Sequence, residues 1–118
     1  MTTDWADDIV LANLADEPAL SDELGAILDR LESMDDAAPP SVVLDFSAVT
    51  YINSSNIAQL LRLRQSLEPA NRQLRLVGVD GDVLEVMRTT GLDRVLSFSP
   101  DMLTALASVQ IDQSPDAS

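Results

Sequence analysis

Apolar residues follow two different spacings along the chain, one typical of strands and the other typical of helices. Continuous apolar runs predict strands at 9–14, 41–46, 73–79 and 95–98, because a strand that is covered on both faces needs no polar alternation. Apolar residues three and four positions apart predict helices at 21–33, 57–67, 82–90 and 100–109. This alternating order predicts an α/β fold, with a mixed central sheet of about four to five strands and about four helices.

Capping residues and helix breakers mark the expected ends of the later helices. Asp82, with Glu85 three positions further on, resembles a capping box, and Gly91 suits the left-handed residue that closes a helix. Ser99 is expected to cap the last helix, with a proline at the first helical position. We expect this last helix to fade near Val109.

The composition fits one soluble, cytoplasmic domain. The 118 residues are enough for one hydrophobic core but not for two, and 46% of them are apolar. We expect a single folded domain over residues 1–110 and a flexible C-terminal tail over residues 111–118. No apolar run is long enough to cross a membrane, and the acidic N-terminus lacks the features of a secretion signal.

The net charge of −13 is distributed unevenly along the chain. The first 36 residues carry eleven acidic side chains and one arginine, whereas six of the seven arginines lie between Arg62 and Arg94. Such a surface repels nucleic-acid phosphates and anionic lipids, so we expect neither nucleic acid nor a membrane as a partner. It suits a basic protein partner, although a solvated, solubilising surface accounts for the same composition.

Missing residue types weaken enzyme hypotheses. Without histidine the chain lacks the commonest general base and metal ligand, and without lysine it cannot build a phosphate-binding loop of the Gly-Lys-Ser/Thr type. Without cysteine it has neither a disulfide nor a thiol nucleophile. We therefore expect a protein that is not an enzyme and that holds no metal and no cofactor.

The most informative segment joins the second predicted strand to the helix that follows it. The polar residues Asn53, Ser54, Ser55 and Asn56 stand directly before an amphipathic helix. A helix start leaves free backbone N–H groups beside these short side chains, and negative charge is favoured there. A serine at this place either carries a phosphate or serves as an ordinary helix cap, and the segment alone does not distinguish the two.

The residues on both sides of this junction resemble the STAS domain, the fold of bacterial anti-sigma factor antagonists. That family has an apolar strand ending in Leu-Asp-apolar-Ser, and then Asp-Ser-Ser-Gly at the start of a leucine-rich helix. This chain has Leu44-Asp45-Phe46-Ser47 and Asn53-Ser54-Ser55-Asn56 at those places. Residues 74–79 and 83–93 resemble the next strand, helix and closing turn. The likeness covers about Ile9 to Val109, with the family's N-terminal hairpin reduced to one strand.

The resemblance implies both a function and a site. It puts the phosphoacceptor on Ser55, with Ser54 as the alternative, and it implies an anti-sigma factor with serine kinase activity as the partner. Unphosphorylated antagonist would sequester this partner, which itself would bind ATP, and so free the sigma factor. A phosphate would add roughly −1.5 to −2 charges at the helix start and weaken docking. The expected partner contacts are Asn53, Ser54, Asn56, Ile57 and Gln59.

Two departures from the family pattern leave other hypotheses open. Asn53 replaces an acidic residue and Asn56 replaces a glycine, yet asparagine is a good helix cap, so the fold should be retained. The competing hypothesis is a non-phosphorylated STAS scaffold that self-associates, as a homodimer or in a larger signalling assembly. A receiver domain around Asp45 is disfavoured because the required lysine is missing. Calcium at Asp80 and Asp82 is disfavoured because no glutamate has the required spacing.

Overall fold

The computed structural model describes residues 3–6, 8–34 and 39–113, and it contains one five-stranded mixed sheet in the order β1-β2-β3-β4-β5. β1 runs antiparallel to β2, whereas β2, β3, β4 and β5 are parallel to one another. The strands are β1 (Thr3–Trp5), β2 (Ile9–Ala15), β3 (Ser41–Ala48), β4 (Leu74–Val77) and β5 (Ser97–Ser99). The predicted α/β fold class with four to five strands is confirmed.

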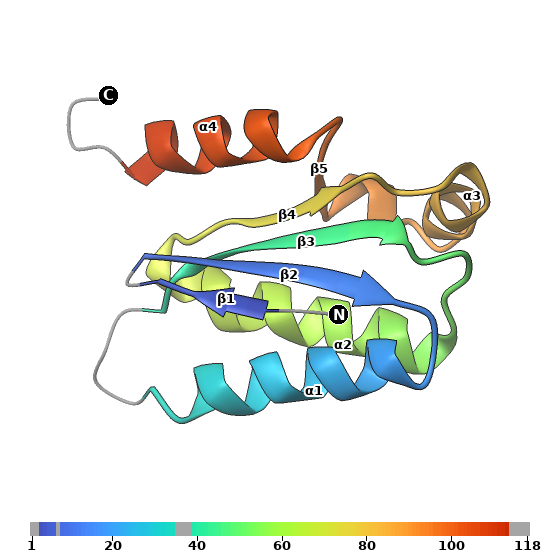
Figure 1. The fold of residues 1–118 in the computed structure, drawn as a ribbon, viewed down its shortest axis with the longest axis horizontal. Coiled ribbons are helices and arrows are strands. Elements are labelled where there is room, and N and C mark those ends of the chain that lie inside the picture. Colours follow the sequence, from blue (N-terminus) through green and yellow to red (C-terminus); the bar gives the residue numbers. More distant parts are fainter. Residues whose placement is uncertain (1–2, 7, 35–38, 114–118) are drawn as a thin grey trace.

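Helices cover both faces of this sheet, as Figure 1 shows: α1 and α2 pack side by side on one face, and α4 lies on the other. The helices are α1 (Ala19–Glu32), α2 (Ser54–Leu67), α3 (Gly81–Thr89) and α4 (Met102–Gln113), with short 3₁₀ turns at Glu68–Ala70 and Leu92–Arg94. α1, α2 and α3 each connect two neighbouring parallel strands, which need such crossover connections. Each of the four helices follows a parallel strand, so all four begin at the carboxyl edge of the sheet.

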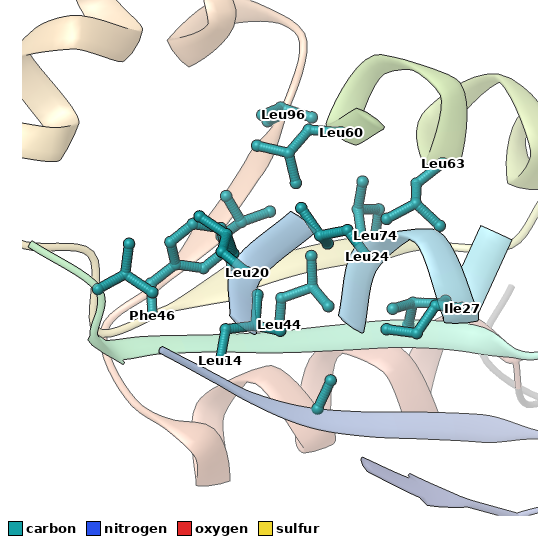
Figure 2. Packing of buried hydrophobic residues seen from close by; sticks show 14 of the residues in the cluster. Leu14, Leu20, Leu24, Ile27, Leu44, Phe46, Leu60, Leu63, Leu74 and Leu96 are labelled. Carbon is teal, nitrogen blue, oxygen red and sulfur yellow. The ribbon is translucent and has the colours of Figure 1, made fainter. Parts of the chain in front are cut away.

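The main core lies between the sheet and the pair α1 and α2. In Figure 2 Leu20, Leu24 and Leu63 from these helices lie over the sheet, and they belong to one cluster with Leu44 and Phe46 of β3. Val43, the residue before Leu44, faces the other way and packs with α4 in a smaller cluster. β3 is therefore buried on both faces, which explains its uninterrupted apolar sequence.

The N-terminal hairpin is present, so the expectation that it is reduced to one strand was wrong. β1 pairs with β2 in register, with Thr3 opposite Ala12 and Trp5 opposite Val10. Three residues that include a polar pair carry too little periodicity to predict a strand. The hairpin is held from outside the sheet, because the Arg30 guanidinium lies 4.1 Å from the centre of the Trp5 ring.

Several predicted ends are displaced by contacts that the sequence did not reveal. The cap of α3 is Asp80, whose carboxylate accepts a hydrogen bond from the Asp82 N–H at 3.0 Å, and not Asp82 itself. The cap of α4 is Asp101 in place of Ser99, since the Thr104 N–H donates to its carboxylate at 2.8 Å. β4 stops at Val77 because Gly78 turns the chain with φ +67°.

The last two elements also differ from the prediction. β5 begins at Ser97, later than predicted, because the preceding residues form a 3₁₀ turn, which the bond from Val95 N–H to Leu92 O closes at 3.1 Å. α4 continues to Gln113, beyond the expected domain end at residue 110. The rest of the predicted tail, residues 114–118, lies outside the described residues.

Candidate functional site

The polar segment Asn53–Asn56 forms the start of α2, as the sequence predicts. Asn53 is extended (φ −118°, ψ 177°), and its side-chain oxygen accepts a hydrogen bond from the Asn56 N–H at 2.9 Å. In return the Asn56 side-chain oxygen accepts from the Asn53 N–H at 3.0 Å. This reciprocal capping box fixes the first turn of the helix with two asparagines in place of the usual Ser/Thr and Glu pair.

Ser54 and Ser55 occupy the first two helical positions, and both are exposed. Asn53 caps the N–H of Asn56, and the N–H of Ile57 donates to Asn53 O at 3.1 Å. Among the described residues, the N–H groups of Ser54 and Ser55 have no acceptor in the protein. Two free N–H groups and two exposed hydroxyls therefore meet at the positive end of the helix dipole.

Asn56 is not available to a partner, which corrects its assignment as a partner contact. The residue is 0% exposed. Its side-chain amide donates to the Ser21 hydroxyl at 3.2 Å and lies 3.4 Å from a carboxylate oxygen of Glu17. Asn56 therefore joins the start of α2 to the start of α1, and it replaces the family's glycine with a buried hydrogen-bonding group.

Gln59, another expected partner contact, also turns toward α1. Its side-chain N–H donates to the Ser21 carbonyl at 3.0 Å, and its side-chain oxygen is buried without a hydrogen-bond partner in the described part of the chain. Ile57 is half-buried and packs against the main core. Of the five expected partner contacts, Asn53 and Ser54 are the two that are exposed.

Glu17 is the residue that sequence reasoning missed. One carboxylate oxygen accepts from the Ser21 N–H at 2.6 Å, and the other accepts the Ser21 hydroxyl proton and lies 3.4 Å from the amide nitrogens of both Asn53 and Asn56. These hydrogen bonds, those of Ser21 above all, hold the pKa of Glu17 below its usual 4.5. A glutamate four residues before a serine at a helix start was the sequence signal that could have predicted this hydrogen-bonded pair.

Two further carboxylates fix the loops around the site. Asp16 accepts from the N–H and the hydroxyl of Thr50, both at 2.7 Å, and these bonds lower the pKa of Asp16. The loop before α2 is thereby tied to the loop before α1. Asp45 accepts from the Ser47 N–H at 2.8 Å and from its hydroxyl at 2.5 Å, so its carboxylate is held near the end of β3.

Within the described residues, no group of three or more acidic side chains is arranged to hold a metal ion. In the same part of the chain, no helix has the length and apolarity needed to cross a membrane.

The fold, together with the similarity to known proteins, identifies the family of the chain. The family model of the STAS domain matches residues 10–105, and the chain belongs to this family. No curated protein matches the chain significantly.

Solved structures support the same fold. The chain is similar to an anti-sigma-factor antagonist (STAS) domain protein from Planctomyces limnophilus, with 18% identity, a TM-score of 0.77 and coverage of 92% of this chain and 97% of that one. It is similar to the anti-sigma factor antagonist SpoIIAA in its unphosphorylated form, with 15% identity, a TM-score of 0.74 and coverage of 92% and 95%. A chain of the stressosome, a signal integration and transduction hub, has 19% identity, a TM-score of 0.70 and coverage of 92% and 96%.

Proposed function

We propose that this chain acts in the cytoplasm as an anti-sigma factor antagonist. It binds an anti-sigma factor that has serine kinase activity, through the edge formed by Asn53, Ser54 and Ser55, and it accepts a phosphate on Ser55. The chain is the substrate and not the kinase, because ATP and the catalytic base belong to the partner.

One observation carries the proposal: two exposed serine hydroxyls stand at the first turn of α2, beside two N–H groups that have no acceptor in the described protein. The capping box formed by Asn53 and Asn56 holds this turn rigid. A partner thus meets a preformed surface and loses little conformational freedom on binding. The similarity to anti-sigma factor antagonists supports the same function.

The transfer itself requires little of this chain. The hydroxyl oxygen of Ser55 forms a bond to the γ-phosphorus of ATP, and the bond from that phosphorus to ADP breaks. The hydroxyl proton passes to a base of the partner. The chain's contribution is to hold the hydroxyl at a fixed place on a rigid helix start, which is the positioning that phosphoryl transfer depends on.

The added charge weakens docking more than it weakens the fold. The two free N–H groups and the helix dipole favour a phosphate at this place. The carboxylate of Glu17, bound to Asn53 and Asn56, opposes it. Phosphorylation therefore adds a second anionic group to the start of α2, where Glu17 already contacts Asn53 and Asn56. A partner surface that is complementary to the unmodified edge then loses affinity.

A second function, that of a scaffold that is never phosphorylated, is favoured by a specific observation. The position of the family's glycine carries the side chain of Asn56, which is fully used in linking α1 to α2. A helix start that is held in place by a buried side chain suits a constitutive contact, as in a larger signalling assembly. The structural similarity to a stressosome chain agrees with this second function.

The test is phosphate transfer from a serine kinase whose gene neighbours that of this chain. We expect incubation with the kinase and ATP to add one phosphate, mapped by mass spectrometry to Ser55. Ser55→Ala should abolish the label, whereas Ser54→Ala, the matched control in the same turn, should retain it. Stable binding without any label would support the scaffold and overturn phosphorylation. The absence of binding would overturn the antagonist function and leave only a scaffold that self-associates.

A further inference from the structure

A second feature of the carboxyl edge is an apolar groove between the end of β4, the first turns of α3 and the end of β5. Its volume is about 360 Å³, at the lower end of the roughly 300–1,000 Å³ that is usual for binding pockets. The apolar residues that line it are Leu76, Val79, Leu84, Phe98 and Pro100.

Leu84 is the residue that gives this groove an open apolar wall. It is partly exposed and belongs to neither core cluster of the described residues, whereas Val79 and Phe98 pack against the main core. The groove is therefore not a packing defect of the core. Its base is formed by residues that pack against the main core, and its outer wall, Leu84, keeps apolar surface that a partner can cover.

The rim of the groove is acidic. Asp80 and Asp82 begin α3 beside Val79, and Asp101 begins α4 directly after Pro100; all three are exposed. The nearby Arg88 is 3.6 Å from the Glu85 carboxylate and is therefore partly neutralised. An apolar floor with a carboxylate rim is complementary to an apolar side chain that is flanked by cations.

The groove lies on the same edge of the sheet as the serines. β3, β4 and β5 are parallel, so the loops that follow them, which lead into α2, α3 and α4, gather at one edge, on the right of Figure 1. One partner can then contact the start of α2 and the groove at the same time. Two linked contacts raise the affinity of each through effective concentration.

A second copy of this chain is a poor occupant because it offers few free cations. The chain has no lysine, and of its seven arginines Arg62, Arg64 and Arg88 are paired with carboxylates of their own chain. A fourth, Arg30, lies over Trp5. The charge of the groove points to a different protein.

We propose that the groove binds a segment of the partner protein in which one or two apolar side chains are flanked by arginine or lysine. This proposal rests on the proposed function, since it names the chemistry of the partner that docks at the same edge. The groove holds the apolar anchor, and the carboxylates of Asp80, Asp82 and Asp101 fix its cationic neighbours.

The first test is a nuclear magnetic resonance titration of the full ¹⁵N-labelled chain with the peptide Arg-Arg-Leu-Ala-Leu-Arg-Arg. Shifts confined to residues 78–84 and 98–101 are expected, and a peptide with glutamate in place of arginine should give none. Leu84→Gln should weaken binding about tenfold, the loss expected for one apolar side chain. Val86→Gln, on the same helix but outside the groove, should bind as the wild type does. No shifts, or shifts spread over other surfaces, would overturn the proposal.

The second test uses the neighbouring kinase and separates the two proposals. Leu84→Gln should weaken kinase binding about tenfold, and Val86→Gln should not. Equal binding by both variants would show that the groove does not bind the kinase, and it would leave the proposed function unaffected. Groove binding by the peptide without any binding of the kinase would overturn the proposed function alone. Dimerisation of the free chain that Leu84→Gln abolishes would show that the groove binds a second copy instead.

Discussion

The amide group of Asn56 donates a hydrogen bond to the hydroxyl of Ser21 at 3.2 Å, and this bond joins the first turn of α2 to the first turn of α1. The two residues are 35 positions apart in the chain. The same amide lies 3.4 Å from Glu17, and the Asn56 oxygen accepts from the Asn53 N–H. One buried side chain thus fixes the helix start that presents the serines.

Replacing Asn56 by alanine should destabilise the fold. The substitution leaves the Asn53 N–H without its capping oxygen and removes the link to Ser21, so we expect the free energy of unfolding to fall by about 1–3 kcal/mol. Asn53→Ala, at the exposed cap, should cost about 1 kcal/mol. Urea denaturation of both variants tests whether Asn56→Ala loses more unfolding free energy than Asn53→Ala. A larger loss of unfolding free energy for Asn53→Ala would contradict the linking role of Asn56.

The stability contributed by Glu17 should depend on pH. Its hydrogen bonds with Ser21, Asn53 and Asn56 lower the pKa of the carboxylate in the folded chain below the usual 4.5. The contribution is therefore complete above the unfolded-state pKa and is lost as the pH falls through the lower folded-state pKa. The difference in unfolding free energy between the wild type and Glu17→Gln should be largest near neutral pH and shrink in acid.

A matched control for this pH dependence is Asp29→Asn, on the exposed side of the same helix. Because no described residue donates a hydrogen bond to its carboxylate, Asp29→Asn should lower the unfolding free energy less than Glu17→Gln at neutral pH. A Glu17→Gln difference that grows as the pH falls would show that the carboxylate does not hold these hydrogen bonds in solution.

Glu17 should also control how well the start of α2 accepts negative charge at Ser55. In the wild type, Ser55→Glu adds a carboxylate near that of Glu17, whereas in a Glu17→Gln background the repulsion is absent and the helix dipole favours the new charge. We expect Ser55→Glu to raise the melting temperature more, or lower it less, in the Glu17→Gln background. A double-mutant cycle by thermal denaturation measures this coupling. A coupling energy of zero would show that Glu17 and Ser55 act independently.

Gly78 and Gly91 are a natural pair for separating backbone strain from steric overlap. Both have positive φ, +67° and +81°, but a Cβ on Gly78 would overlap the Ser47 hydroxyl, whereas Gly91 has open space. Gly91→Ala should cost about 1–2 kcal/mol from the left-handed backbone alone. Gly78→Ala should cost about 1–3 kcal/mol more, because the overlap adds to the strain.

The Ser47→Ala variant provides the check on this assignment. Removing the hydroxyl should recover part of the extra cost of Gly78→Ala and none of the cost of Gly91→Ala. Equal losses for the two single glycine variants, measured by chemical denaturation, would mean that the turn after β4 relaxes away from Ser47.

The two faces of the molecule should respond very differently to the loss of a leucine. Leu63 is 0% exposed in the main core, and Leu63→Ala should cost about 2–5 kcal/mol. Leu103, on α4, is 79% exposed, and Leu103→Ala should change the unfolding free energy by less than about 0.5 kcal/mol. Thermal melts of both variants test the placement of the core, and a large loss at Leu103 would mean that α4 is covered in solution.

Local patterns determined most of the framework of this protein. The apolar run before Asp45 identified a strand buried on both faces, and the polar residues Asn53–Asn56 identified the start of a helix, because each depends on neighbours within a few positions. The alternation of elements fixed the α/β class. The exposed serines at the start of α2 also followed from this local order.

Contacts between distant segments were decided by the tertiary structure. The sequence gives no local sign that Glu17 meets Asn53 and Asn56, 36 and 39 positions away, or that Gln59 turns inward to Ser21. Packing α1 against α2 brings these polar groups out of water together, and each then needs a partner that only the fold can supply. Local sequence thus determined that the site lies at the start of α2. The packing of α1 against α2 decided which side chains of the site are buried and which remain exposed to a partner.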